Sequence, residues 1–255
     1  MFTSYTHSGF SFYDNQLPGQ AIVFVHGLGA NAMFADFLLR AFPKRRLLLC
    51  ELPGHGQAPE PSLPVDISVL ALQLARVLEE KGIFKPIMCG HSLGGQICLL
   101  AEVVRPGLAD RLWLISPAGL ESFSPSEIQM ISSGWQMSGL FHPYVAPKYQ
   151  STLLNEPMRL PTPTVLKQYV ESMMTRPVID LLQHIHCDAQ VYFGELDLLI
   201  PNRLFRPEAS IPFARRTLKN WPHFHVFGIP GAGHWPMLEN AKALVQNLQD
   251  HNRDI

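Results

Sequence analysis

Short apolar segments alternate with longer segments of helical periodicity along most of this 255-residue chain. The apolar segments are residues 21–26, 46–52, 86–92, 111–116, 189–195 and 224–229. Continuous apolar runs of this length are typical of strands buried on both faces. Because strands that alternate with helices are joined by right-handed crossovers, the pattern predicts an α/β protein. Its sheet should be mostly parallel and twisted, with helices on both faces.

The helical segments are residues 31–42, 66–82 and 93–105. The clearest is the second, in which apolar residues such as Leu74 and Leu78 recur on one face. Asp66 stands where an N-cap is expected, and Gly82 stands where a helix usually ends. These signals predict a helix bounded by Asp66 and Gly82.

The alternation stops between residues 117 and 187. That segment is rich in methionine, aromatic residues and proline, a composition typical of short helices in an inserted cap. We therefore predict a core domain of residues 1–117 and 187–255, with a helical cap of residues 118–186 inserted in it. The alternative is that these methionines pack into a second part of the core.

The composition limits the classes of partner. Hydrophobic residues make up 47% of the chain and charged residues 16%, which indicates a compact globular protein. A formal net charge of -1 gives no electrostatic reason to expect nucleic acid or an anionic membrane as partner. The N-terminal residues lack the features of a secretory signal, no run reaches about 18 apolar residues, and the cysteines show no C-x-x-C spacing. We predict a cytoplasmic protein without a membrane span, of unknown oligomeric state.

A serine stands between two glycines, in Gly-His-Ser-Leu-Gly at residues 90–94, where a buried strand is predicted to turn into a helix. In a parallel sheet the ligand-binding crevice lies outside the carboxyl ends of the strands, so Ser92 points into it. Such a tight turn needs a strained backbone at the serine and neighbours without bulk, which Gly90 and Gly94 provide. Ser92 is therefore a candidate nucleophile.

A serine hydroxyl needs a neighbouring base that takes its proton as it attacks. Among the 11 histidines, His234 follows the last predicted strand in a glycine-rich loop. The base in turn needs an acid that holds its tautomer, and Asp197 follows the strand of residues 189–195 at the same edge of the sheet. Glu195 is the nearest competitor, but its offset turns it to the other side of the turn. We predict that Ser92, Asp197 and His234 form a catalytic triad.

The G-x-S-x-G motif in this setting resembles the nucleophile elbow of the α/β-hydrolase superfamily, and the chain order of the three residues is that of the superfamily. The resemblance covers nearly the whole chain outside the predicted cap, and it implies the α/β-hydrolase fold. It also implies an oxyanion hole formed by the backbone N–H groups of Leu28 and Leu93.

Two further features bear on the loops around the serine. His26, in His-Gly-Leu-Gly, is expected to brace its loop by hydrogen bonds rather than to react. Glu51 stands where the superfamily usually has aspartate, before a Pro-Gly-His-Gly turn that we interpret as structural. His184 and His186 lie close in sequence, but their spacing fits no standard zinc site. We therefore predict no metal and no cofactor.

The predicted function is hydrolysis of a small to medium carboxylic ester or thioester through an acyl-enzyme. The Gly-His-Ser-Leu-Gly-Gly elbow and the Pro-Gly-His-Gly turn resemble those of the carboxylesterases related to the pimeloyl carrier-protein methyl ester esterase. The menaquinone-pathway synthase that eliminates pyruvate and the meta-cleavage carbon-carbon hydrolases share the motifs, so a lyase or carbon-carbon hydrolase is the first alternative. A binding protein of the same fold with a silent site is the second.

The substrate pocket is expected to include Leu28 and His91, because they adjoin the reacting atoms, and Trp135, Met137 and Phe141 from the cap. A stretch with the basic residues Arg203, Arg206, Arg215, Arg216 and Lys219 follows Asp197. It is either a solvated helix face or a surface that steers an acidic carrier protein or a phosphate-bearing acyl group. The expected substrate is therefore a small-molecule ester, free or carried on an acyl-carrier protein.

Overall fold

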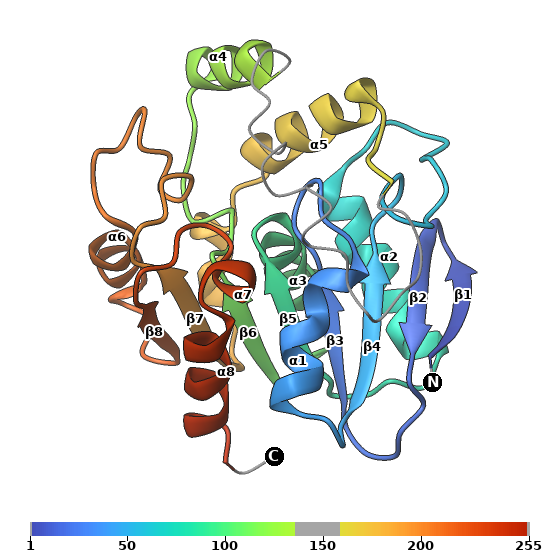
Figure 1. The fold of residues 1–255 in the computed structure, drawn as a ribbon. Helices are drawn as coiled ribbons and strands as arrows, with labels where there is room; N and C mark the ends of the chain where they lie inside the picture. The colour runs from blue at the N-terminus through green and yellow to red at the C-terminus, as the bar shows by residue number, and fades with distance from the viewer. Residues whose placement is uncertain (1, 136–158, 254–255) are drawn as a thin grey trace.

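The computed structural model describes residues 2–135 and 159–253, whose backbone forms a central sheet flanked by helices (Figure 1). The strands are β1 (Thr3–His7), β2 (Phe10–Asp14), β3 (Ala21–Val25), β4 (Arg46–Glu51), β5 (Ile87–His91), β6 (Arg111–Ile115), β7 (Asp188–Gly194) and β8 (Phe224–Ile229). They form one 8-stranded sheet in the order β1-β2-β4-β3-β5-β6-β7-β8. β2 pairs antiparallel with β1 and β4, and the remaining pairs are parallel. The predicted α/β-hydrolase sheet is confirmed.

Helices cover both faces of this sheet. They are α1 (Asp36–Ala41), α2 (Ile67–Glu80), α3 (Leu93–Val104), α4 (Pro125–Trp135), α5 (Pro163–Thr175), α6 (Ser210–Leu218), α7 (Pro236–Glu239) and α8 (Ala241–Asp250). Apolar residues of α2, α3 and α6 belong to one hydrophobic core, whereas those of α1, α7 and α8 belong to a second core on the opposite face. None of the helices in the described part of the chain has the length and apolar character needed to cross a membrane.

The predicted helices appear with small shifts at their ends. Asp66 caps α2, its carboxylate accepting from the Ser68 N–H at 2.8 Å, and Gly82 follows the helix with φ +67°. The segment of residues 31–42 is divided, because a 3₁₀ turn at Ala32–Ala35 precedes α1. The side chain of Asn31 accepts from Met33 N–H and so starts the tighter turn.

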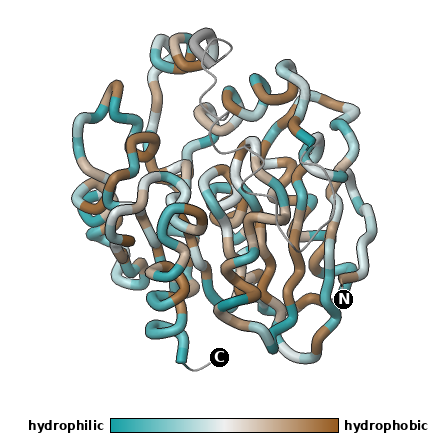
Figure 2. Tube along the Cα trace, in the orientation of Figure 1, coloured by the Kyte–Doolittle hydropathy of each residue, from teal (hydrophilic) through white to brown (hydrophobic). Residues whose placement is uncertain are grey.

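The apolar runs of the sequence are buried on both sides of the sheet. Figure 2 shows the hydrophobic residues along the central strands. Alternate residues of β5 divide between the cores: Met88 packs in one, whereas Ile87 and Cys89 pack in the other. This division explains why the run reads as continuously apolar rather than alternating.

Two helices from the segment between β6 and β7 lie beyond the carboxyl ends of the strands (Figure 1). α4 and α5 contact each other, and α5 also contacts α2. Tyr169 of α5 is fully buried and donates from its hydroxyl to the Pro53 carbonyl at 3.0 Å. α5 is therefore attached to the loop that follows β4. The division into a core and a cap of residues 118–186 stays a prediction.

Candidate active site

Ser92 is the single residue between β5 and α3. β5 ends at His91 and α3 begins at Leu93. The backbone of Ser92 has φ 52° and ψ -118°, a conformation that is costly for a residue with a side chain. Because Leu93 is the first residue of α3, its N–H has no acceptor within the helix.

The glycines of the elbow allow helix α3 to approach two strands. A Cβ on Gly90 would lie 2.5 Å from the carbonyl oxygen of Gly94, and a Cβ on Gly94 would lie 2.1 Å from that of Val25 at the end of β3. Both contacts are with backbone atoms, which cannot move aside. The need for small residues at these two positions, expected from the sequence, is present in the structure.

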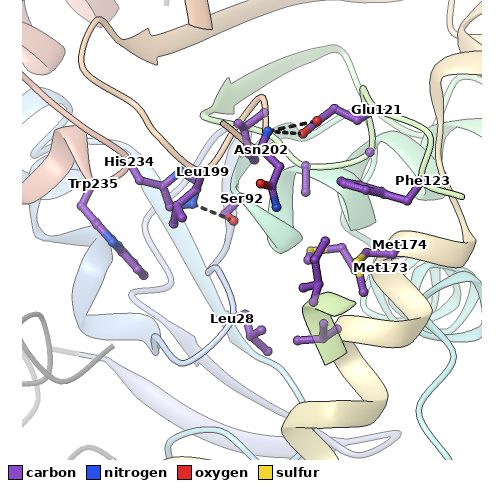
Figure 3. Close-up of a pocket in the computed structure, with 15 residues that line it drawn as sticks. Leu28, Ser92, Glu121, Phe123, Met173, Met174, Leu199, Asn202, His234 and Trp235 are labelled. Atoms are coloured by element: carbon purple, nitrogen blue, oxygen red, sulfur yellow. Dashed lines mark hydrogen bonds between the residues drawn. The ribbon is translucent and has the colours of Figure 1, made fainter. Parts of the chain in front are cut away.

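Ser92, His234 and Asp197 form a continuous chain of hydrogen bonds, of which Figure 3 shows the part between Ser92 and His234. The Ser92 hydroxyl donates to His234 Nε2 at 3.0 Å, and His234 Nδ1 donates to Asp197 Oδ2 at 2.9 Å. The three predicted triad residues are therefore brought together. All three are buried, Asp197 almost completely.

The carboxylate of Asp197 is fixed by its own loop. Its Oδ1 accepts from the N–H groups of Leu199 at 2.8 Å and Ile200 at 3.1 Å. Burial by itself raises the pKa of Asp197, but His234 and these two amides outweigh it and hold the pKa below its ordinary value. Glu195, the sequence competitor, is exposed.

His91 does not line the cavity above Ser92, contrary to the sequence expectation. Its ring is fully buried and packs on Trp235 with ring centroids 4.5 Å apart. Its Nε2 donates to the main-chain oxygen of His234 at 2.9 Å. The reason is strand alternation, which places His91 on the same face of β5 as Ile87 and Cys89. His91 therefore lies behind the hydrogen-bonded chain.

Two buried histidines join the loop of residues 26–29 to the loop that follows β4. His26 Nε2 accepts from the Leu52 N–H at 3.0 Å, and His55 Nε2 accepts from the Gly29 N–H at 3.1 Å. Burial lowers the pKa of His26 to about 4, and burial together with His26 lowers the pKa of His55 well below its ordinary value. Both rings are therefore neutral near pH 7, as these acceptor roles require. His26 braces its loop, as expected.

Glu51 connects the chain that follows β3 to the loop that follows β4. Its carboxylate accepts from the Ala32 N–H at 3.3 Å and the Gln57 N–H at 2.7 Å. A Cβ on Gly56 would lie 2.2 Å from the Glu51 carboxyl carbon, so the longer side chain uses the space that this glycine leaves. The departure from aspartate therefore leaves the turn intact.

A cavity of about 100 Å³ opens above the Ser92 hydroxyl (Figure 3). Its lining residues are Leu28, Ser92, Ala118, Gly119, Glu121, Phe123, Ile131, Val170, Met173, Met174, Leu199, Ile200, Asn202, His234 and Trp235. The predicted pocket residue Leu28 is among them. Trp135 ends α4, but the position of its side chain lies outside the described part of the structure, and Met137 and Phe141 lie outside the described residues.

Sequence reasoning missed most of the cavity wall. Glu121 and Phe123 come from the loop after β6, whereas Leu199 and Asn202 come from the loop after β7. The signal that could have found them is the one that located Asp197, because these loops also follow the carboxyl ends of parallel strands.

The basic stretch is partly neutralised by nearby acids. Arg206 lies 3.5 Å from a Glu121 carboxylate oxygen, and Arg216 lies 2.6 Å from that of Glu208 on the surface. Within residues 2–135 and 159–253, no group of three or more histidine, cysteine or acidic residues is placed to bind a metal ion.

Comparisons with known proteins agree with the fold. Residues 22–247 match a model of the Alpha/beta hydrolase family. The chain is 33% identical over 105 residues to the dihydrolipoyllysine-residue acetyltransferase component of an acetoin cleaving system from Pseudomonas putida, which covers 40% of this chain and 28% of that protein. It is 32% identical over 111 residues to an sn-1-specific diacylglycerol lipase ABHD11 from Mus musculus, which covers 42% of this chain and 35% of that protein. The matches thus span about a third of these curated relatives.

Among solved structures, an esterase (EaEST) from Exiguobacterium antarcticum superposes with a TM-score of 0.78 at 16% identity, over 98% of this chain and 99% of that one. At this identity the superposition shows a shared fold. The family match extends from β3 into α8 and includes Ser92, Asp197 and His234. The chain therefore belongs to the α/β-hydrolase family.

Proposed function

We propose that this protein is a serine-dependent carboxylic ester hydrolase in which Ser92, His234 and Asp197 act as the triad. The observation that carries the proposal is the unbroken hydrogen-bonded chain from the Ser92 hydroxyl to the Asp197 carboxylate, at the floor of a cavity. Within this geometry the hydroxyl proton has an acceptor, and the acceptor has a fixed tautomer.

In the first half of the reaction, Ser92 Oγ attacks the ester carbonyl carbon while His234 Nε2 takes the hydroxyl proton. Asp197 stabilises the imidazolium that forms, and its depressed pKa keeps it ionised throughout. The tetrahedral intermediate collapses to an acyl-serine as His234 returns the proton to the leaving alcohol. In the second half, water repeats the same steps and releases the acid.

The developing oxyanion needs donors on the far side of the carbonyl, and the backbone amides of Leu28 and Leu93 are the proposed pair. Leu93 follows the nucleophile directly and begins a 12-residue helix whose N-terminal dipole favours negative charge. Leu28 lies in the loop that His26 and His55 fix in place. Each donor is expected to contribute on the order of 3 kcal/mol to the transition state.

The apolar residues of the cavity wall are suited to bind an apolar acyl or alcohol group of the substrate. Ile131 of α4 and Val170, Met173 and Met174 of α5 line it, so the helices beyond the sheet provide its apolar side. Flexible methionine side chains adapt to substrates of different shape. We expect esters of small to medium chain length to be cleaved.

The decisive experiment is labelling with a fluorophosphonate, followed by mass spectrometry of the digested protein. We expect one adduct, on Ser92, and no adduct in the Ser92→Ala variant. Ser11→Ala is the matched control, because Ser11 is also buried but lies on β2, away from the cavity. An adduct on another residue, or none in the wild type, would contradict the proposal.

A panel of p-nitrophenyl esters of increasing acyl length then tests the reaction itself. Hydrolysis of these esters, with a maximum rate at one acyl length, would support the proposal that the protein is an esterase. A wild-type protein that is labelled at Ser92 yet cleaves none of these esters would favour the carbon-carbon hydrolase or lyase alternative, in which the triad serves another bond.

A further inference from the structure

Glu121 is an acidic residue in the cavity wall that the proposed reaction does not use. It lies in the loop after β6, its side chain is 5% exposed, and it lines the same cavity as Ser92 and His234. In Figure 3 its side chain lies beside Asn202, across the cavity from Leu28. A carboxylate at this position needs an explanation, because burying a charge is costly unless it is paired.

The pairing of Glu121 is incomplete. Its two carboxylate oxygens share the backbone N–H of Asn202 at 3.0 and 3.1 Å. Among the described residues the cation that contacts it is Arg206, which is 3.5 Å away and is also 3.6 Å from the Glu127 carboxylate. One guanidinium thus serves two carboxylates, and the cluster keeps a formal charge of -1. Burial, the largest cause, raises the pKa of Glu121 to about 7, and the nearby charge of Asp197 adds to this effect.

The rest of the lining does not compensate this charge. Among the described residues that line the cavity, there is no lysine or arginine. The polar side chains that accompany Glu121 there are Ser92, Asn202, His234 and Trp235, and the others are apolar or glycine. A substrate carboxylate in this cavity would therefore face a like charge, whereas a hydroxyl, amide or ammonium group would find an acceptor.

We propose that Glu121 is a specificity-determining residue that selects uncharged or hydrogen-bond-donating esters and excludes esters that carry a second, ionised carboxyl group. This inference rests on the proposed ester hydrolysis and adds the charge class of its substrate. Glu121 and Glu127 share Arg206, but only Glu121 of the two lines the cavity. Glu121 is therefore the carboxylate that meets the substrate.

Glu121 also joins two loops, and this structural role must be separated from selection. Through Asn202 and Arg206 it connects the loop after β6 to the loop that carries Asp197. Loss of that connection would slow all substrates together. Selection by charge instead changes the ratio of rates between two substrates of the same shape, which a purely structural role would not move.

The matched substrates are the monomethyl ester of a dicarboxylic acid and the same ester with its free carboxyl group converted to the primary amide. Their length is set by the optimum from the ester panel, and hydrolysis is followed by pH-stat at pH 8. We expect the wild type to favour the amide in kcat/KM by on the order of 30-fold, from like charges several ångströms apart at an effective dielectric constant of roughly 20.

The Glu121→Gln variant keeps the shape and the acceptor for the Asn202 amide but removes the charge. We expect this variant to lower the kcat/KM preference for the amide substrate over the carboxylate substrate by about tenfold or more. Glu195→Gln is the control, because Glu195 is exposed and lies outside both the cavity lining and the Glu121 cluster, and its ratio should match that of the wild type.

The outcomes are distinct. A wild type that cleaves both substrates equally well would overturn the inference while leaving ester hydrolysis intact, and this result does not depend on any variant folding. A Glu121→Gln variant that slows both substrates with an unchanged ratio would overturn it in favour of the structural role. Failure to cleave any ester would contradict the proposed function and this inference together.

Discussion

The imidazole of His91 donates from Nε2 to the main-chain oxygen of His234, with 2.9 Å between the two atoms. The residue before the proposed nucleophile thus anchors the backbone of the proposed base. Burial lowers the pKa of His91 to about 3, with a smaller effect from His234, so the ring stays neutral and keeps this single donor at neutral pH. The relationship makes His91 a positioning residue, and the first prediction concerns it.

Replacing His91 with leucine removes the donor and leaves the His234 carbonyl buried without it. We expect kcat to fall by roughly tenfold with little change in KM, because orientation rather than substrate contact is lost. His91→Gln can donate from a similar position and should restore most of kcat. Steady-state kinetics of the two variants check this, and equal losses in both would show that the hydrogen bond does not matter.

The second prediction concerns Ser92, the proposed nucleophile. Ser92→Ala should lower kcat by on the order of 10⁴-fold or more, because the residual rate depends only on binding and the oxyanion donors. Its thermal unfolding midpoint should stay close to that of the wild type, since alanine fills the same turn. An ester assay and a thermal melt suffice, and retained activity would remove Ser92 from the reaction.

The third prediction tests whether Asp197 or Glu195 is the acid that holds His234. Asp197→Asn keeps an oxygen for the Leu199 and Ile200 amides but places an NH₂ group against His234 Nδ1. The imidazole then adopts the wrong tautomer, with its proton on Nε2 facing Ser92, and we expect a loss in kcat of on the order of 10³-fold or more. Glu195→Gln, at an exposed position, should retain full activity. A similar loss in both variants would reopen the choice of acid.

The fourth prediction is a pH dependence of stability due to Glu121. Its pKa is about 7 in the folded protein against 4.5 for the free side chain, so the folded state binds more protons between these values. The stability of the wild type therefore falls as the pH rises through this window, whereas Glu121→Gln has no such loss. The advantage of the variant in unfolding free energy should grow by about 2 kcal/mol between pH 5 and pH 8.

Urea denaturation at the two pH values measures that difference. The groups that face Glu121 are the Asn202 amide, Arg206, Asp197 and Glu127, and all are present in both proteins. Glu127→Gln serves as the control, because hydrogen bonds from Ser124 lower rather than raise the pKa of that carboxyl group. An advantage that stays constant with pH would refute the prediction.

The strands, the elbow and the convergence of Ser92, Asp197 and His234 could be predicted because they depend on local signals. A run of apolar residues identifies a strand buried on both faces, and chain order then places its carboxyl end. The orientation of His91 is also encoded in the sequence, because strand alternation places it on the same face of β5 as the buried residues Ile87 and Cys89.

The cavity wall could not be predicted in the same way. Glu121 and Asn202 are 81 positions apart in the chain, and they meet only because β6 and β7 are neighbours in the sheet. No periodicity indicates which side of an irregular loop faces a cavity. The basic stretch likewise gives no signal that Arg206 pairs with Glu121 of the cavity wall, because the two residues lie on separate loops.

The guanidinium of Arg206 lies over the Phe123 ring, 4.9 Å from its centre, and contacts Glu121 and Glu127 as well. The two loops that it joins are those that line one side of the cavity. Attempts to alter substrate range by randomising residues 119–124 alone would therefore also disturb the segment that orients Asp197. Mutant libraries that aim to change the substrate range should vary both loops together. They should either keep Arg206 or change Arg206, Glu121 and Glu127 at the same time.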